Sequence, residues 1–201
     1  NDRAQCDVRI YGGWYEETLM TRMAQDVTIE IQRDFPAVIR LPKVNQTVSV
    51  TVTAKAELAV ALLQEPSHHL FNTYRRKGRP NNLRVETPEN VGCTEKDCLL
   101  PLMKTLIRTG QCAKPGCSTN SSNLVYRHEQ KTVDTMLSCD LIHGGYAQYD
   151  VVVLVSGDDD FLPPLRTVLL QGTSAIRIHP KRNGTRTSFP QGGGKFFEVD
   201  L

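Results

Sequence analysis

The sequence predicts an α/β fold built around a mostly parallel sheet. The run Val151–Val155 contains five apolar residues, four of them β-branched, and such a run is typical of a central parallel strand that is covered on both faces. Helix and strand patterns alternate around this run, and that order implies parallel strands joined by right-handed crossovers. Three consecutive carboxylates follow the strand, Asp158, Asp159 and Asp160, at the position where α/β proteins keep their chemistry.

The pattern is clearest in the second half of the chain. Residues 130–147 carry apolar side chains at helical offsets and predict a helix. We then expect a strand at Val151–Val155, a helix at Leu162–Leu170 that stops at Gly172, and a strand at residues 175–178. Residues 182–194 are rich in Gly, Thr and Ser and predict a loop, before a last strand at residues 195–199.

The first half of the chain gives weaker patterns. Residues 7–11 alternate apolar and polar residues before Gly12 and Gly13, which predicts a strand that ends in a turn. Residues 15–31 have mixed helical spacing and predict a helix, whereas residues 44–53 are rich in β-branched residues and favour a strand. Residues 57–63 fit either a short helix or a strand.

Composition limits the classes of protein to consider. A chain of 201 residues with 39% hydrophobic and 23% charged residues is typical of a soluble globular domain with elaborations. The formal net charge of +2 is too small to argue for nucleic-acid binding by itself. No apolar run reaches the length of a membrane span, and the N-terminal residues lack a signal-peptide pattern. We therefore expect a cytoplasmic protein without a membrane partner, and homo-oligomerisation stays open.

The acidic residues predict a cation site. Adjacent carboxylates repel one another unless a cation neutralises them, and hard oxygen ligands suit Mg²⁺ or Mn²⁺. A turn residue or a helix-cap neighbour is the ordinary role of a single Asp, but three acids beside a buried strand favour a functional site. Asp134 and Asp140 in the preceding helix are further candidates. They lie about 120° apart around an ideal helix, and a solvated helix face is the alternative for each.

These residues resemble a known family. Residues 131–178 look like the NYN domain, the branch of PIN-like nucleases that includes the bacterial LabA-like proteins. The step of 18 residues from Asp140 to Asp158 also resembles the step between the later acids of PIN domains. The matching positions are Lys131, Asp134, Asp140, Ser156, Gly157, Asp158, Asp160, Phe161 and Pro163. Residues 7–17 weakly resemble the second strand of that fold, and the family's first strand, which ends in a further Asp, is not visible before Asp2.

The resemblance implies a fold and an activity. The fold is a single three-layer PIN-like domain over residues 1–201, with residues 66–123 as a basic, Cys-rich insert. The activity is that of a metal-dependent endoribonuclease acting on single-stranded or structured RNA. Its expected catalytic residues and Mg²⁺ or Mn²⁺ ligands are Asp134, Asp140, Asp158 and Asp160. Two alternatives stay open: a catalytically impaired nucleic-acid-binding or regulatory module of the same fold, and a phosphatase or other hydrolase that uses the same acids.

Four of the six cysteines form two equally spaced pairs. These are Cys93 with Cys98, and Cys112 with Cys117. Four thiolates at such spacings could hold a structural Zn²⁺ ion in a zinc knuckle. Two disulfides or four small buried thiols are the alternatives. The remaining cysteines, Cys6 and Cys139, are expected in the core.

Two basic stretches are candidates for RNA contacts. The first combines Arg75, Arg76, Lys77 and Arg79 with Phe71 and Tyr74 as surfaces for base stacking, although a solvated loop fits equally well. The second lies next to the predicted sheet end and consists of Arg177, Lys181, Arg182 and Arg186. The resemblance adds Lys131 and Ser156 as helpers at the phosphate.

Overall fold

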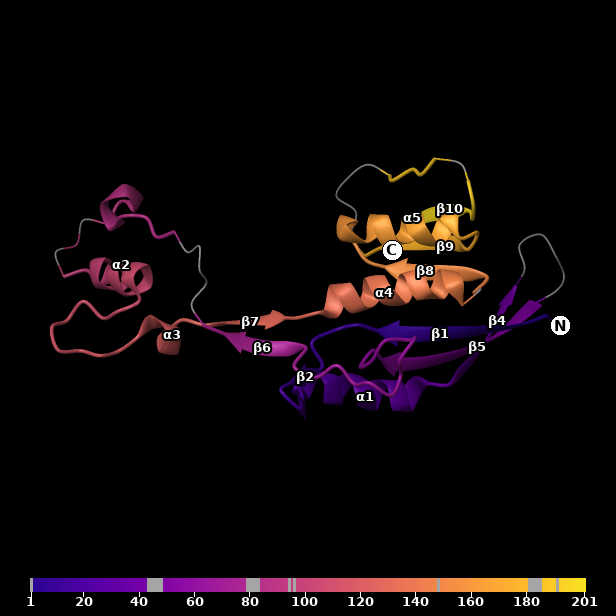
Figure 1. The fold of residues 1–201 in the computed structure, drawn as a ribbon, viewed down its shortest axis with the longest axis horizontal. Coiled ribbons are helices and arrows are strands. Elements are labelled where there is room, and N and C mark those ends of the chain that lie inside the picture. Colours follow the sequence, from indigo (N-terminus) through magenta and orange to yellow (C-terminus); the bar gives the residue numbers. More distant parts are fainter. Residues whose placement is uncertain are drawn as a thin grey trace.

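The protein consists of a body and a lobe that two strands connect (Figure 1). The computed structural model describes residues 2–42, 49–78, 84–93, 95, 97–147, 149–180, 186–190 and 192–201. The body contains two three-stranded sheets together with the helices α1, α4 and α5. The mixed α/β class predicted from the sequence is therefore confirmed.

The C-terminal sheet follows the predicted pattern closely. Its strands β8 (Val151–Val155), β9 (Ser174–His179) and β10 (Phe196–Asp200) are all parallel, in the order β10-β9-β8. The helices α4 (Val133–Tyr146) and α5 (Leu162–Leu170) pack together beside this sheet. Gly172 adopts a φ of 93° after α5, a conformation that glycine adopts without steric cost. The core of this half consists of Leu141, Leu154, Phe161, Leu165, Val168, Leu169 and Ala175.

The N-terminal sheet has the order β1-β5-β4. Strand β1 (Asp2–Ile10) pairs in parallel with β5 (Ser49–Leu58), and β4 (Ala37–Pro42) pairs with β5 in the antiparallel direction. The helix α1 (Arg22–Asp34) starts later than expected, because Thr21 caps it by accepting a hydrogen bond from the Ala24 N–H. A short hairpin of β2 (Tyr15–Glu16) and β3 (Leu19–Met20) occupies the residues before the cap. Local helical spacing could not distinguish this hairpin from a first helical turn.

The single central sheet predicted from the sequence is not found among the described residues. The two sheets remain separate, and β8 is an edge strand rather than a central one. Val151, Val153 and Val155 are 44, 51 and 58% exposed, so only the alternate side chains face the helices. The prediction of a central strand was wrong because an apolar run shows that a strand is suited to burial, but it does not show which elements cover that strand.

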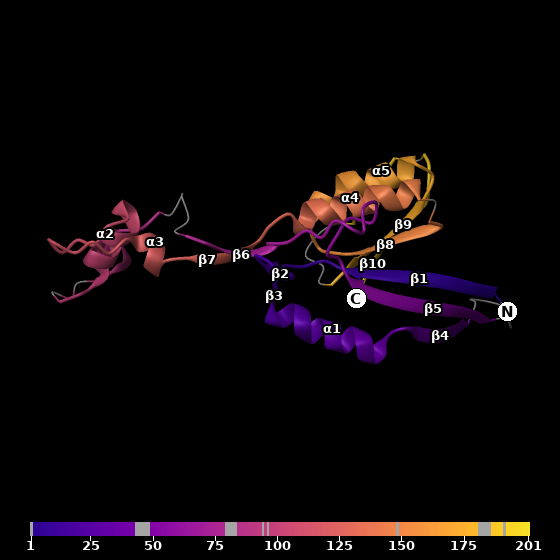
Figure 2. The ribbon, with the colours of Figure 1, turned by 60° about the horizontal axis from the view of Figure 1, so that its bottom comes forward.

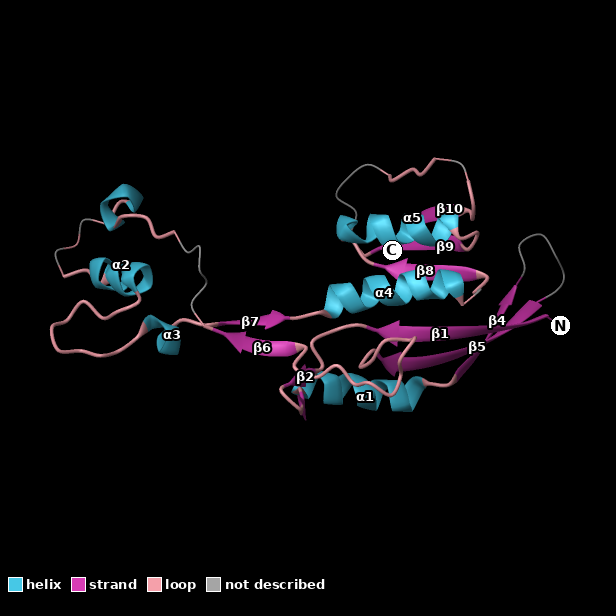
Figure 3. Ribbon diagram, viewed as in Figure 1, coloured by secondary structure: helices cyan, strands magenta, loops and turns pink. Residues whose placement is uncertain are grey.

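The lobe comprises the residues between β6 (Tyr74–Lys77) and β7 (Arg127–Gln130), which pair as an antiparallel ribbon. It contains η1 (Pro88–Val91), α2 (Leu100–Thr109) and α3 (Ser121–Leu124), and loops make up most of the rest (Figure 3). No residue of α2 is buried, and its apolar Leu100, Leu102 and Met103 are exposed. This helix therefore contributes no hydrophobic core to the lobe. In the part of the chain that the structure describes, no helix has the length and apolar character needed to cross a membrane.

Candidate functional site

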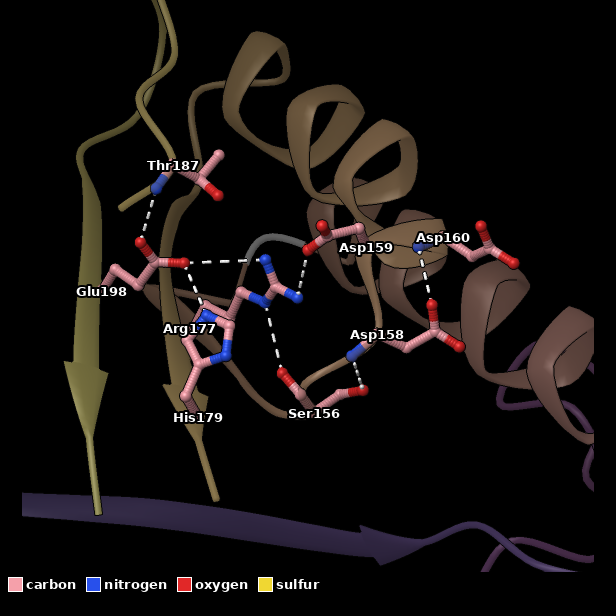
Figure 4. Close-up of polar contacts among 8 residues, drawn as sticks. All are labelled: Ser156, Asp158, Asp159, Asp160, Arg177, His179, Thr187 and Glu198. Atoms are coloured by element: carbon pink, nitrogen blue, oxygen red, sulfur yellow. Dashed lines mark hydrogen bonds and ion pairs between the residues drawn. The ribbon is translucent and has the colours of Figure 1, made fainter. Parts of the chain in front are cut away.

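The candidate site is the turn that follows β8. The backbone N–H of Asp158 donates to Ser156 Oγ at 3.1 Å, and Asp158 Oδ1 accepts from the Asp160 N–H at 3.0 Å (Figure 4). Asp158 is thus the N-cap of the short helix η2 (Asp159–Phe161). Ser156 serves as a turn residue here, since its hydroxyl is engaged by the backbone. The turn holds its acidic side chains at the surface, where all three are exposed.

Two of the expected metal ligands have no partner in the described part of the chain. Asp160 lies in η2 and Asp134 lies in the first turn of α4, and both side chains are exposed. No hydrogen bond or ion pair to either carboxylate occurs within the described residues. Helix α4 begins at the same end of the C-terminal sheet at which β8 ends (Figure 1), and Lys131 precedes this helix as an exposed residue. Within the part of the chain that the structure describes, the side chains of Asp134, Asp160 and Lys131 are therefore free to meet a ligand.

Asp140 is placed very differently. This residue of α4 is buried, and its carboxylate accepts hydrogen bonds from the Tyr11 hydroxyl and the Leu63 N–H, both at 2.8 Å. Arg9 lies 3.6 Å away and compensates its charge. Burial, and next the Asp140 charge, raise the pKa of Tyr11 well above its usual range. Asp140 therefore anchors α4 to the end of β1.

A buried arginine on the neighbouring strand β9 contacts the acidic turn. Arg177 on β9 is 0% exposed; its Nη2 lies 2.8 Å from Asp159 Oδ1 and its Nε donates to the Ser156 carbonyl at 3.2 Å (Figure 4). The expectation that Arg177 contacts phosphate is wrong, because its side chain is enclosed. Arg177 lies two residues after the core residue Ala175, so both side chains point to the same face of β9. This spacing was the sequence signal that could have revealed the burial of Arg177.

The support extends to β10 through Glu198. Its Oε1 lies 2.7 Å from His179 Nε2 and 3.6 Å from Arg177 Nη1, and its Oε2 accepts from the Thr187 N–H at 2.7 Å (Figure 4). Burial raises the pKa of the Glu198 carboxyl, but the hydrogen bonds from His179 and Thr187 outweigh burial and hold the pKa below its ordinary value. This network of ion pairs and hydrogen bonds connects the turn after β8 with β9 and β10.

The expected ligands do not fit a metal site as the structure places them. Among the described residues, no group of three or more His, Cys, Asp or Glu side chains could hold one metal ion. The carboxylate of Asp140 is occupied by protein donors, and Asp134, Asp158 and Asp160 remain separate acids at one end of the sheet. A site for Mg²⁺ or Mn²⁺ would require these three to approach one another.

The cysteines of the lobe form two separate pairs of free thiols. Cys93 Sγ lies 3.1 Å from Cys98 Sγ, and this hydrogen bond raises the pKa of the Cys93 thiol. Cys117 Sγ lies 3.3 Å from Thr119 Oγ1, and the hydrogen bonds with Thr119 lower the pKa of the Cys117 thiol because they stabilise the thiolate. The two pairs do not assemble into a four-thiol site. Since none of the four is buried, the alternative of buried thiols is wrong.

Cys6 and Cys139 are both exposed, so their expected place in the core is also wrong. Cys6 lies in the exposed first part of β1. Cys139 lies on an outward-facing part of α4, directly before the buried Asp140. Both cysteines lie in regular elements of the body, but membership of a helix or strand does not determine whether a small side chain points to the core or to solvent.

The cations of the first basic stretch line the β6–β7 ribbon. Arg75, Lys77 and Arg127 lie 2.7, 3.5 and 3.0 Å from the carboxylate of Glu129, whose pKa is lowered first by the hydrogen bond from Arg75. Arg76 stacks over the ring of Tyr126 at 3.7 Å. These contacts hold the cations in an ordered array that still carries a net positive charge.

The aromatic residues of this stretch contact other rings. Tyr74 stacks on His128 with ring centroids 5.1 Å apart, and Phe71 packs edge-on against Tyr15. Three further candidates for RNA contacts, Arg79, Lys181 and Arg182, lie outside the described residues. The ribbon therefore carries the described cations of the first basic stretch, whereas Lys131 and Arg186 are exposed outside it.

Comparison of the chain with protein-family models, with curated proteins and with solved structures found no match. The resemblance to the NYN domain therefore stays a prediction from the residues that carry it. The geometry of the site supplies the remaining arguments about function.

Proposed function

We propose that the chain is a metal-dependent endoribonuclease of the NYN type, which hydrolyses RNA phosphodiester bonds at the turn after β8. The observation that carries this proposal is the exposure of Asp134, Asp158 and Asp160 at one end of the C-terminal sheet. Exposed carboxylates that no protein cation neutralises repel one another and attract cations. A position at the carboxyl end of a parallel strand is the usual place for catalysis in α/β folds.

The role of the metal in this proposal is limited. Mg²⁺ or Mn²⁺ would supply a Lewis acid for the phosphodiester and a more acidic water molecule. Because the described acids are not gathered around one position, we derive no step of hydrolysis through the ion. Asp134, Asp158 and Asp160 are its proposed ligands, and Asp140 keeps its structural role.

The proposed partner is RNA, held by its phosphates. Arg76, Lys77 and Arg127 lie on the exposed ribbon that leads away from the body. Cations in such an array position a nucleic-acid backbone without reading its sequence. Binding at the ribbon would fall steeply with rising salt concentration, since it depends on counterion release.

A second candidate function is favoured by the environment of Asp140. One of the four carboxylates is committed to Tyr11, Leu63 and Arg9, and the remaining acids do not form a ligand group in the described part of the chain. A module that binds RNA and does not cleave it would need only the ribbon and the fold. It is the alternative that we retain.

The deciding experiment compares cleavage of a labelled RNA in Mn²⁺ by the wild-type chain and by Asp158→Asn. Asn keeps the capping hydrogen bond and removes the charge, so the turn should persist. We expect the substitution to lower the cleavage rate by about 100-fold or more, on the scale of losing a main electrostatic contribution to catalysis. Asp26→Asn, which removes an exposed acid from α1, is the matched control and should cleave normally.

The outcomes separate the two candidates. Binding of RNA by all three proteins without cleavage by any supports the non-catalytic module. Equal cleavage by the wild type and by Asp158→Asn would contradict the proposed active site, because the activity would then arise elsewhere or from a contaminant.

A further inference from the structure

A cavity of about 520 Å³ lies beside the edge strand β10 and the helix α5. It is lined by three consecutive residues where β10 begins, Lys195, Phe196 and Phe197. Side chains alternate between the two faces of a strand, so consecutive lining residues place the cavity at an edge of β10. That edge is free in the described part of the chain, because β10 pairs only with β9. We call this cavity, whose volume lies in the range of about 300–1,000 Å³ that is usual for small-molecule sites, the β10 pocket.

The β10 pocket is separate from the acidic turn. Strands β8, β9 and β10 are parallel, so the start of β10 and the end of β8 lie at opposite ends of the sheet (Figure 1). No residue of the turn lines the pocket, whose other walls come from α5 and from residues 187–190 and 192–194. A ligand in this pocket would therefore leave the proposed metal site unoccupied.

The walls of the β10 pocket are held by contacts with the body. The rings of Phe189 and Phe196 pack edge-on with centroids 4.8 Å apart, and both rings pack against the hydrophobic core. Arg166 Nη1 on α5 donates to the Pro190 carbonyl at 3.0 Å. A Cβ atom on Gly193 would overlap a carbonyl oxygen in the last turn of α5, so only glycine permits this close approach. The pocket is thus shaped before any ligand enters.

The charges of the β10 pocket select an anion. Its lining includes the cations Arg166 and Lys195 and no Asp or Glu. Neither cation forms an ion pair within the part of the chain that the structure describes. The bond to Pro190 occupies one of the five N–H donors of Arg166, so other donors remain for a ligand. A phosphate group, whose oxygens accept several charge-assisted hydrogen bonds, matches these two cations.

The aromatic residues of the β10 pocket select a planar ring beside that anion. Phe197 is 53% exposed, and its ring contacts no other aromatic ring among the described residues. Exposed aromatic rings next to cations bind nucleobases by stacking. The hydroxyl groups of Thr187 and Ser188 can form hydrogen bonds with a sugar. An inorganic anion would use only the cations and a lipid chain only the rings, whereas a nucleotide would use both.

We propose that the β10 pocket binds one nucleotide, whose phosphate pairs with Arg166 and Lys195 and whose base stacks on Phe197. The nucleotide is a free mononucleotide or one unit of a single RNA strand, because both present the same phosphate and base. Binding in this pocket does not depend on the proposed nuclease activity, since it uses none of the acids that follow β8.

The first test is a calorimetric titration of the protein with adenosine 5′-monophosphate, without added Mg²⁺ or Mn²⁺. Lys195→Ala removes the exposed cation of the pocket, and Lys55→Ala, on the exposed side of β5, is its matched control. We expect Lys195→Ala to weaken binding about tenfold, because a charge-assisted hydrogen bond to phosphate is lost, and Lys55→Ala to leave binding unchanged. Adenosine, which lacks the phosphate, should bind more weakly and should not distinguish Lys195→Ala from the wild type.

The ring of Phe197 is tested in the same titration. Phe197→Ala should weaken binding of the mononucleotide about tenfold, the scale of losing one base-stacking contact. Tyr146→Ala removes another exposed ring, at the end of α4, and is the matched control, since Tyr146 is 71% exposed. It should bind as the wild type does.

Competition with RNA identifies the source of the nucleotide. A single-stranded adenosine hexanucleotide that displaces the mononucleotide would show that the pocket takes one unit of an RNA strand. Saturable binding of the mononucleotide that the hexanucleotide does not displace would show that the ligand is a free mononucleotide. Either result supports the β10 pocket as a nucleotide site.

Three outcomes would overturn the proposal. They are the absence of saturable mononucleotide binding, equal weakening by Lys195→Ala and Lys55→Ala, and binding that Phe197→Ala leaves unchanged. Because the titrations contain no added metal, they measure binding alone. A failure of RNA cleavage would therefore count against the proposed nuclease activity without affecting this result.

Discussion

At the residue scale, Asp134 and Asp140 show how two acids on one helix acquire opposite roles. Asp134 is exposed in the first turn of α4, where its charge also suits the positive end of the helix dipole. Asp140 is buried and accepts hydrogen bonds from Tyr11 and Leu63. Sequence patterns do not distinguish these two acids, but Asp134 is available to a ligand, whereas Asp140 stabilises the fold.

This difference predicts different effects on stability. Asp140→Ala leaves Arg9 and the Tyr11 hydroxyl without their acceptor and should lower the free energy of unfolding by about 3 kcal/mol, as expected for removal of one partner from a buried ion pair. Asp134→Ala should cost less than about 1 kcal/mol. Urea denaturation of the two variants measures both values. Equal destabilisation would show that Asp140 does not anchor α4.

The network at Glu198 predicts a dependence of stability on pH. The pKa of this carboxyl is lower in the folded protein than in the unfolded chain, so its contribution to stability is present above the unfolded pKa of about 4.3. That contribution should be lost as the pH falls through the folded pKa. The difference in unfolding free energy between the wild type and Glu198→Gln should be constant near neutral pH and should shrink below about pH 4. A difference that grows on acidification would contradict the assignment.

At the scale of elements, Arg177 holds the C-terminal sheet and its acidic turn together. It connects β9 with Asp159 and the Ser156 carbonyl after β8, and it lies near Glu198 on β10. The orientation of Asp158 and Asp160 therefore depends on a residue that touches neither of them.

Replacing Arg177 should loosen the turn and weaken the sheet. Arg177→Met keeps most of the buried volume but removes every hydrogen bond, and we expect a loss of about 2 kcal/mol. Amide exchange at residues 156–160 should become faster, which a general loss of stability alone would not confine to this turn. Arg40→Met, on the exposed face of β4, is the matched control. Unchanged exchange at the turn would show that Arg177 does not position it.

At the scale of the whole molecule, the lobe lies apart from the body and is joined to it by the β6–β7 ribbon (Figures 1 and 2). Its longest helix buries no residue, and small units without a hydrophobic core usually need a metal or disulfides. The four thiols of the lobe are free and form two pairs that are not gathered into one site. Structural zinc in the lobe accordingly stays a prediction.

Elemental analysis of the purified protein tests whether the lobe binds structural zinc. If zinc bridges the two pairs, the wild type should contain about one zinc per chain, and the double substitution Cys93→Ser and Cys112→Ser should abolish it, because Zn²⁺ needs four ligands in a closed structural site. The matched control replaces the exposed cysteines of the body, Cys6 and Cys139, and should retain the metal. Zinc-free wild-type protein, purified without chelators, would rule out the knuckle.

Sequence patterns predicted some parts of the molecule well because short-range physics determines them. The strand Val151–Val155 and the helix Leu162–Leu170 occur as expected, since periodicity, proline at the start of the helix and Gly172 at its end are local signals. The turn role of Asp158 also follows from adjacent residues. The hairpin before α1 was not predicted because the residues before Thr21 also fit helical spacing. Local patterns therefore did not show that the helix begins only after Thr21.

The sequence by itself determined the α/β class, the C-terminal run of helices and strands, and the acids that follow β8. Tertiary structure alone decided that Asp140 is buried, that Arg177 points inward and that the two sheets remain separate. The physical reason is the distance along the chain between the partners. Tyr11 and Asp140 are 129 residues apart in sequence, so the environment that distinguishes a metal ligand from a buried anchor exists only once the chain has folded.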